Sequence, residues 1–157
     1  MNPLDTPIGF SSTFLFVPGT RPERFAKALD SGADGVIIDL EDAVAHEDKE
    51  SARIAIRAAW PSFTAEQKKR LIIRSNSPGS HFYAADLILV QELDATCILI
   101  PKSESLDQIN DAAQILPNTA IIPMIETAIG LDRLNEIANS EQVLRLALGN
   151  IDLQADL

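Results

Sequence analysis

The chain has 157 residues, of which 46% are hydrophobic and 23% charged, so it is long and apolar enough to bury a core. Its net charge of -10 at pH 7 argues against nucleic acid as a partner, because phosphate backbones are held by clustered lysine and arginine. No apolar run approaches the roughly 18 residues of a membrane span, and residues 1–10 lack the features of a signal peptide. The single cysteine, Cys97, opens an apolar run and is expected to be a buried, inert thiol. These features predict a cytoplasmic protein with no membrane partner.

Six short apolar runs, each followed by a polar and mostly charged cluster, are the predicted β-strands. A strand of a parallel barrel sheet is buried on both faces, so it reads as a continuous aliphatic run rather than an alternating one. The predicted strands are residues 13–17, 36–40, 71–73, 97–100, 120–125 and 144–148.

The segment after the first predicted strand carries strong signals for the start of a helix. Thr20 can cap the helix, Pro22 suits its first position, and Glu23 stands where a capping box needs an acidic residue. The side chains expected to face the sheet are Phe25, Ala26 and Leu29.

Helices are also predicted between the later strands. Residues 47–59 and 84–93 form two of them, and Ser105 with Gln108 suggests a second capping box at the start of a third. The apolar face of the last helix consists of Leu131, Leu134 and Ile137.

The alternation of strands and helices predicts an α/β fold of the TIM (β/α)₈ type, incomplete here with about six βα units. A full barrel typically needs ~250 residues. We therefore expect residues 1–157 to be a single partial TIM-barrel domain, without the last two strands and the C-terminal segment. The same repeat can also be read as a doubly wound open sheet, in which edge strands are normal.

Two carboxylates at the ends of consecutive strands are the strongest candidates for a site. Glu126 and Asp152 lie one strand–helix–strand repeat apart, and residues at the carboxyl ends of barrel strands share one face. Two hard oxygen ligands with room for water and substrate suit Mg²⁺. The alternative is that each residue merely caps the helix that follows it.

Charged residues also follow the earlier strands. Arg74 can grip a substrate carboxylate with two hydrogen bonds, or form a salt bridge to Asp42 or Glu41. One member of this acidic pair could orient metal-bound waters while the other partners Lys102. Asp39, inside the same run, is expected to be structural.

A basic trio, Arg21, Arg24 and Lys27, occupies the expected start of the first helix, where phosphate is favoured. The alternative is an ordinary solvated helix face. His46 and His81 stand in predicted loops without partners at metal-ligand spacing, so both are expected to be surface residues.

Six segments together resemble the citrate lyase β subunit and malyl-CoA lyase group of Mg²⁺-dependent carbon–carbon lyases. They are LFVPGTRPERFAKAL, VIIDLEDAV, IIRSNSPG, ILIPKSES, IPMIETAIGL and ALGNIDLQADL, and they span essentially the whole chain. The family fold is a TIM barrel. Ser75 and His46 depart from the family pattern, in which an aliphatic residue and a proline are usual.

The resemblance implies a role for each matching position. Glu126 and Asp152 would ligate Mg²⁺, and Arg74 would bind the oxo or hydroxy acid end of the substrate. The residues that match coenzyme A contacts are Phe16, Arg21 and Lys27, and those that match a supporting acidic pair at the catalytic site are Glu41 and Asp42.

The reaction implied is a reversible aldol or Claisen-type cleavage of a hydroxy-acyl-CoA thioester, such as malyl-CoA or citramalyl-CoA, to an acyl-CoA and a 2-oxo acid. The family also implies a homo-oligomer, a trimer or hexamer. A thioesterase variant is possible on the same scaffold. Two further alternatives are a citrate lyase β subunit acting on a carrier-protein thioester, and a truncated, non-catalytic chain that binds partners.

Overall fold

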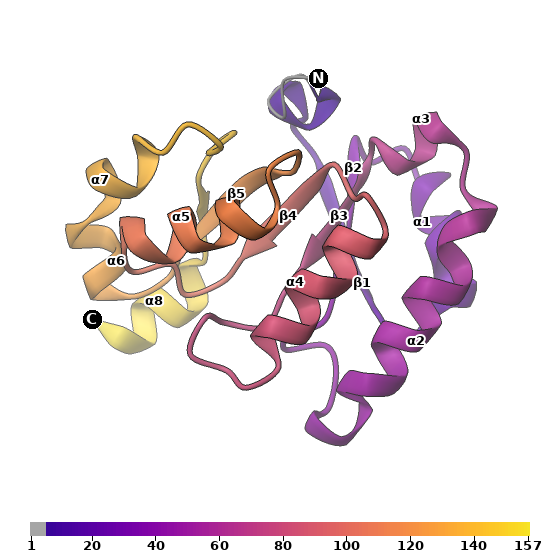
Figure 1. Cartoon of the computed structure of the whole chain (residues 1–157), viewed down its shortest axis with the longest axis horizontal. Helices are drawn as coiled ribbons and strands as arrows, with labels where there is room; N and C mark the ends of the chain where they lie inside the picture. Colours follow the sequence, from indigo (N-terminus) through magenta and orange to yellow (C-terminus); the bar gives the residue numbers. More distant parts are fainter. Residues whose placement is uncertain (1–5) are drawn as a thin grey trace.

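The computed structural model describes residues 6–157 and contains one sheet of six parallel strands in the order β1-β2-β3-β4-β5-β6. The strands are β1 Phe14–Pro18, β2 Gly35–Asp39, β3 Leu71–Arg74, β4 Cys97–Ile100, β5 Ala120–Ile125 and β6 Ala147–Leu148. Each strand pairs with the next one along the chain, without the reversal of order that defines a doubly wound sheet. The sheet curls into a half-barrel (Figure 1), which confirms the incomplete TIM-type barrel.

Helices connect the strands and cover the outer face of the sheet (Figure 1). The 3₁₀ turns are η1 Pro7–Phe10, η2 Pro22–Arg24, η3 His46–Asp48 and η4 Trp60–Ser62. The α-helices are α1 Phe25–Leu29, α2 Lys49–Ala59, α3 Ala65–Lys68, α4 Tyr83–Glu92, α5 Leu106–Ile115, α6 Ala128–Asp132, α7 Leu134–Ala138 and α8 Asn150–Asp156. None of the helices in this described part of the chain is long and apolar enough to cross a membrane. Residues 1–5, part of the segment where no signal peptide is predicted, lie outside it.

Strands β2 to β5 are buried on both faces, as their aliphatic runs predict, whereas the edge strands β1 and β6 are partly exposed. One core cluster lies between the sheet and the helices and includes Val36 and Ile38 of β2. A smaller cluster lines the inside of the barrel and includes Ile37 and Ile72. Since side chains alternate along a strand, Asp39 and Arg74 continue the inner-facing rows of β2 and β3. The two residues are also register partners, so the sheet itself brings them together.

Several elements match the sequence prediction closely. Strands 97–100 and 120–125 have the predicted bounds. The capping box of Ser105 and Gln108 is present at the start of α5. A further capping box, of Thr64 and Gln67, starts the short helix α3 that the prediction missed.

The predicted capping box of Thr20 and Glu23 is wrong. The residue before the first turn is Arg21, which makes no side-chain cap bond, and the turn is 3₁₀ rather than α-helical. The tighter turn changes which residues face the sheet, so Ala26 is exposed and Ala28 is buried in its place.

The end of the chain also differs from the prediction. The last predicted helix is split into α6 and α7 at Arg133, and Leu131 is 43% exposed. The strand predicted over 144–148 has only two residues in β6, which pairs with β5.

Candidate functional site

Five of the eight predicted site residues gather in a cavity of about 410 Å³ at the carboxyl ends of the strands. Glu126 directly follows β5, and Asp152 lies in the first turn of α8. The lining residues are Phe16, Asp42, Arg74, Met124, Glu126, Leu148, Gly149, Asn150, Ile151 and Asp152. The structure therefore brings together both predicted metal ligands, Arg74, one member of the acidic pair and one predicted coenzyme A contact.

Arg74 is held in place by Asp39. Its Nε and Nη2 atoms donate to the two oxygens of Asp39 at 2.7 and 2.6 Å. Asp39 also accepts the backbone N–H groups of Glu41 and Ala43, at 2.8 and 3.0 Å. This residue, expected to be structural, thus fixes both the arginine and the loop after β2, and it is a closer partner of Arg74 than Glu41 or Asp42.

The third nitrogen of Arg74, Nη1, faces the acidic pair. It lies 3.0 Å from Glu41 Oε2 and 3.5 Å from Asp42 Oδ2, while the guanidinium carbon is 5.0 Å from the centre of the Phe16 ring. Burial lowers the pKa of Arg74, but the hydrogen bonds and charge of Asp39 raise it by more than burial lowers it. The net pKa is above the ordinary value, so the guanidinium stays charged.

Glu41 is a buried carboxylate that is only partly compensated. Its Oε1 accepts from Lys102 Nζ at 3.3 Å, whereas the contact of Oε2 with Arg74 lacks hydrogen-bond geometry. Burial raises the pKa of Glu41 to about 7, more than the nearby positive charges of Arg74 and Lys102 lower it. The carboxyl group can therefore gain or lose a proton near neutral pH.

Glu126 is buried and oriented by the backbone. Its Oε1 accepts the N–H of Lys102 at 2.9 Å, and burial raises its pKa above the usual range. A Cβ added to Gly149 would lie only 2.8 Å from the Cβ of Glu126 and still closer to Oε2. Only glycine fits there, and it lets the chain pass directly beside the carboxylate.

Lys102 contacts three carboxylates of this site, two through its ammonium group and one through its backbone N–H. Its Nζ lies 3.3 Å from Glu41 Oε1 and 3.6 Å from Asp152 Oδ2, while its N–H holds Glu126. Burial lowers the pKa of Lys102, but Glu41 and the other carboxylates raise it more, so the net pKa is above the ordinary value. Two acidic side chains thus share the ammonium group of Lys102, and a third is oriented by its backbone.

The donor set suits magnesium rather than zinc. Within residues 6–157 no group of three or more His, Cys, Asp or Glu side chains is arranged around a common metal position. Mg²⁺ does not need such a cage, because it commonly binds one or two carboxylates and keeps several waters or substrate oxygens. Glu126 and Asp152, which line the same cavity, fit that requirement.

The three predicted coenzyme A contacts are only partly brought together. Phe16 and Lys27 line a second groove, of about 410 Å³, along the outer side of β1 and α1, and Arg24 lines it too. Arg21 is not among the lining residues, and its closest acidic neighbour is Glu23 at 3.6 Å. Because α1 has only five residues, the helix-dipole argument for phosphate there loses its basis.

The two histidines are exposed, as predicted, but they are not isolated. The rings of His46 and His81 are 5.2 Å apart, and both lie against Phe82, at 4.7 and 4.0 Å. The sequence gives no sign of this contact, because the residues belong to loops after different strands.

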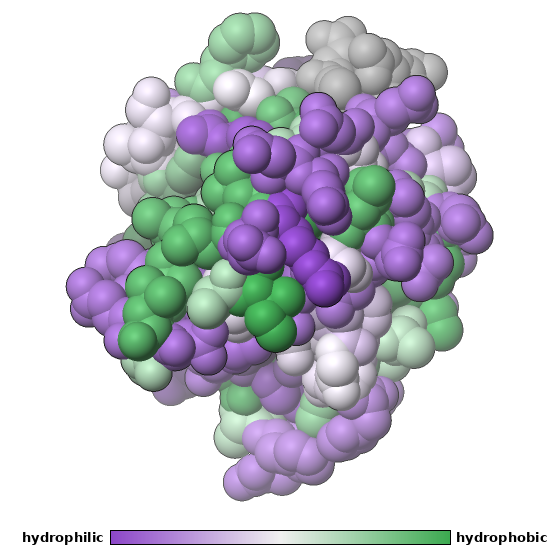
Figure 2. All heavy atoms as spheres, turned by 90° about the vertical axis from the view of Figure 1, so that its left-hand side faces the viewer, coloured by the Kyte–Doolittle hydropathy of each residue, from purple (hydrophilic) through white to green (hydrophobic). Residues whose placement is uncertain are grey.

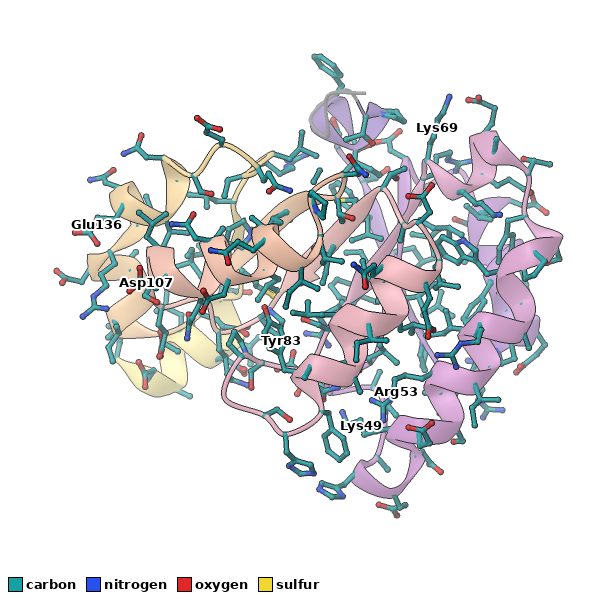
Figure 3. The ribbon with its side chains drawn as sticks, in the orientation of Figure 1. Lys49, Arg53, Lys69, Tyr83, Asp107 and Glu136 are labelled. Carbon is teal, nitrogen blue, oxygen red and sulfur yellow. The ribbon has the colours of Figure 1, made fainter. Side chains whose placement is uncertain are left out.

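Two buried cationic side chains close to the site, Lys49 and Arg53, were not predicted from the sequence. Lys49 Nζ donates to the carbonyl oxygens of Leu40 and Glu41, both at 2.6 Å, and so fixes the backbone of the acidic pair. Lys49 and Arg53 extend from α2 toward α4 (Figure 3), where Arg53 pairs with Asp86 at 2.9 Å. Neither residue was singled out from the sequence, because a local pattern does not show that a helix lysine or arginine is buried.

Comparison with known proteins supports a single family. The family described as HpcH/HpaI aldolase/citrate lyase matches residues 12–157. A (3S)-malyl-CoA thioesterase of Cereibacter sphaeroides is 33% identical over 91% of this chain and 50% of its own length. A citrate lyase subunit beta-like protein of Mycobacterium tuberculosis is 38% identical over 92% of this chain and 49% of its own length. The chain spans about half the length of these curated relatives.

Solved structures show the same fold. The citrate lyase beta subunit of M. tuberculosis complexed with oxaloacetate and magnesium superposes with a TM-score of 0.82 at 35% identity, covering 99% of this chain and 64% of that one. The CitE protein of the same organism, in complex with magnesium, acetoacetate and coenzyme A, also gives a TM-score of 0.82 at 35% identity. This match covers 94% of the present chain and 52% of the CitE chain. The family match over residues 12–157, the half-barrel and these likenesses establish that the chain belongs to the HpcH/HpaI aldolase/citrate lyase family.

Proposed function

We propose that this chain carries the magnesium and substrate site of an enzyme acting on the coenzyme A thioester of a hydroxy acid, such as malyl-CoA or citramalyl-CoA. The reaction is a reversible aldol or Claisen-type carbon–carbon cleavage that gives an acyl-CoA and a 2-oxo acid. The observation that carries the proposal is the single cavity lined by Glu126, Asp152 and Arg74. It is supported by solved relatives in complex with magnesium and oxaloacetate, and with magnesium, acetoacetate and coenzyme A.

Glu126 and Asp152 would hold Mg²⁺. When bound, the ion supplies positive charge that polarises the carbonyl oxygen of the 2-oxo acid. The chain contributes the rigidity of this site, because the Lys102 N–H orients Glu126 and the close passage of Gly149 confines it.

Arg74 would bind the acid end of the substrate through Nη1. Its other two donor positions are engaged by Asp39, so the direction of the guanidinium is set before any substrate arrives. Glu41 and Asp42 flank Nη1 and complete the catalytic site. The pKa of Glu41, about 7, suits a group that takes up or releases a proton at neutral pH.

The groove along β1 and α1 is the proposed place for part of coenzyme A. Phe16 lines both this groove and the site cavity, so it joins the two. Lys27 and Arg24 supply positive charge along the groove, which suits the phosphates of the cofactor.

The test is the variant Glu126→Gln, which keeps the size of the side chain and removes its charge. We expect it to lower Mg²⁺-dependent formation of acyl-CoA and 2-oxo acid from malyl-CoA to background. The matched control is Glu136→Gln, an exposed glutamate on α7 (Figure 3), which should keep full activity. Undiminished turnover by Glu126→Gln would contradict the proposed metal site.

A second candidate is hydrolysis of the thioester, favoured by the relatives named (3S)-malyl-CoA thioesterase. The same assay separates the two reactions, because hydrolysis releases free coenzyme A whereas cleavage releases acyl-CoA. A carrier-protein thioester is the substrate proposed by likeness to the citrate lyase subunit beta of Leuconostoc mesenteroides, 29% identical. Assembly into a homo-oligomer stays a prediction.

A further inference from the structure

Lys102 has an unusual backbone conformation at the centre of the site. It and Asp94 are the two non-glycine residues with positive φ in the described part of the chain, both at 48°. Side chains other than glycine, asparagine and aspartate rarely adopt this left-handed conformation, and such residues cluster at functional sites. Lys102 follows β4 at its carboxyl end, whereas Asp94 precedes β4 at the opposite end.

The backbone and the side chain of Lys102 make separate contacts. The N–H group donates to Glu126 Oε1 at 2.9 Å, a contact that any residue with the same backbone conformation would keep. The ammonium group lies 3.3 Å from Glu41 and 3.6 Å from Asp152. Replacement of the side chain can therefore remove the charge and leave the orientation of Glu126 unchanged.

The contact with Asp152 is the weaker of the two made by the ammonium group. Its distance of 3.6 Å is beyond hydrogen-bond range, and both side chains are about 40% exposed. Solvent-exposed ion pairs contribute little free energy, so another cation can readily replace one partner. The contact with Glu41, by contrast, includes a hydrogen bond to a buried carboxylate.

We propose that the ammonium group of Lys102 pairs with Asp152 in the metal-free site and is displaced from Asp152 when a divalent cation binds. This inference rests on the proposed function, because it assumes that Glu126 and Asp152 form the metal site. The two cations compete for one carboxylate, and the lysine remains paired with Glu41 after the exchange. Lys102 thereby offsets the negative charge of Asp152 until the metal takes its place.

Whether Mg²⁺ affinity rises or falls when the charge of Lys102 is removed tests the exchange. In Lys102→Asn the charge is lost, while asparagine still accepts the left-handed backbone. We expect the variant to bind Mg²⁺ about fivefold more tightly or better at low ionic strength, because a competing positive charge has been removed. A merely structural role predicts the opposite, since a disordered site binds metal more weakly. The readout is isothermal titration with Mg²⁺ alone at pH 8.

Two variants serve as controls and one as a second test. Lys102→Arg keeps the charge and should bind Mg²⁺ like the original chain. Asp94→Asn places the same residue in the same backbone conformation outside the site, and should leave Mg²⁺ binding unchanged. Lys102→Gly provides a second uncharged residue, whose backbone adopts positive φ without strain, in case the asparagine variant folds poorly.

The outcomes separate this inference from the proposed function. If the original chain binds Mg²⁺ and both neutral variants bind it equally or more weakly, the exchange is contradicted and the metal site stands. If neither the original chain nor the neutral variants bind Mg²⁺, the metal site itself is contradicted, and the exchange with it. Tighter binding by both neutral variants supports the exchange.

Discussion

Gly149 is the residue on which the position of Glu126 depends most directly. Its φ of -92° is open to any residue, so the requirement for glycine is steric. In Gly149→Ala the new methyl group would lie 2.8 Å from the Cβ of Glu126, and either the carboxylate or the loop before α8 must move. We expect Mg²⁺ affinity to fall by about tenfold or more, because a displacement of about 1 Å in a positioned group can change its effect by a larger factor. Calorimetric titration measures it.

Gly79 provides the control for that substitution. It lies in the loop between β3 and α4, where an added Cβ would have no heavy atom within 4 Å. Gly79→Ala should therefore leave Mg²⁺ binding unchanged. Equal affinities for the two alanine variants would show that the close passage of Gly149 has no bearing on the metal.

At the scale of elements, a buried ion pair joins α2 to α4 and holds the loop that follows β3. Arg53 donates to Asp86 at 2.9 Å, and Asp86 also accepts the N–H and the side-chain amide of Asn76, both at 2.7 Å. Removing one partner leaves a buried charge uncompensated, so Asp86→Ala should lower the free energy of unfolding by about 3 kcal/mol. Glu50 still pairs with Arg53, which keeps the loss at the lower end of the usual range. Urea denaturation measures it.

A second ion pair between the same helices is the matched control. Arg57 and Glu92 also join α2 to α4, at 2.6 Å, but both side chains are nearly half exposed. Glu92→Ala should cost less than about 1 kcal/mol, because solvent screens exposed pairs. Similar losses in the two variants would argue that burial of the Asp86 pair contributes nothing beyond the contact.

The elements that could be predicted are those with local causes. A continuous aliphatic run marks a strand buried on both faces, and β4 and β5 have the predicted bounds. The pair of Asp39 and Arg74 could not be predicted, because it depends on the register between β2 and β3. Lys49 was missed for a similar reason, since its burial follows from the path of the loop it holds. Local patterns predict elements, and long-range packing decides contacts.

At the scale of the whole molecule, the curled sheet places the ends of all strands on one face, which is why strand-end residues could be predicted as a site. The later part of the chain departs most from the prediction. Several apolar side chains are exposed there, including Leu148, Ile151 and Leu157, and Figure 2 shows apolar patches on the side where α6, α7 and α8 lie. The strand predicted over 144–148 is short because its continuous pairing with β5 is confined to Ala147 and Leu148, while Val143 forms only an isolated bridge to Ile121.

Thermal unfolding with ligands examines the folding of the chain and the assembly of the site together. If Glu126 after β5 and Asp152 in α8 hold Mg²⁺ as proposed, Mg²⁺ and oxaloacetate bind only when both elements are packed. Ligands that bind the native state alone, at a hundredfold excess over Kd, add about 2.7 kcal/mol, which should raise Tm by about 5–10 °C. The Tm of the Glu126→Gln variant should be the same with and without the ligands. A broad transition that neither ligand shifts would mean that the two halves of the metal site are not held together in solution, because differential binding to the folded state is the only way a ligand can raise Tm.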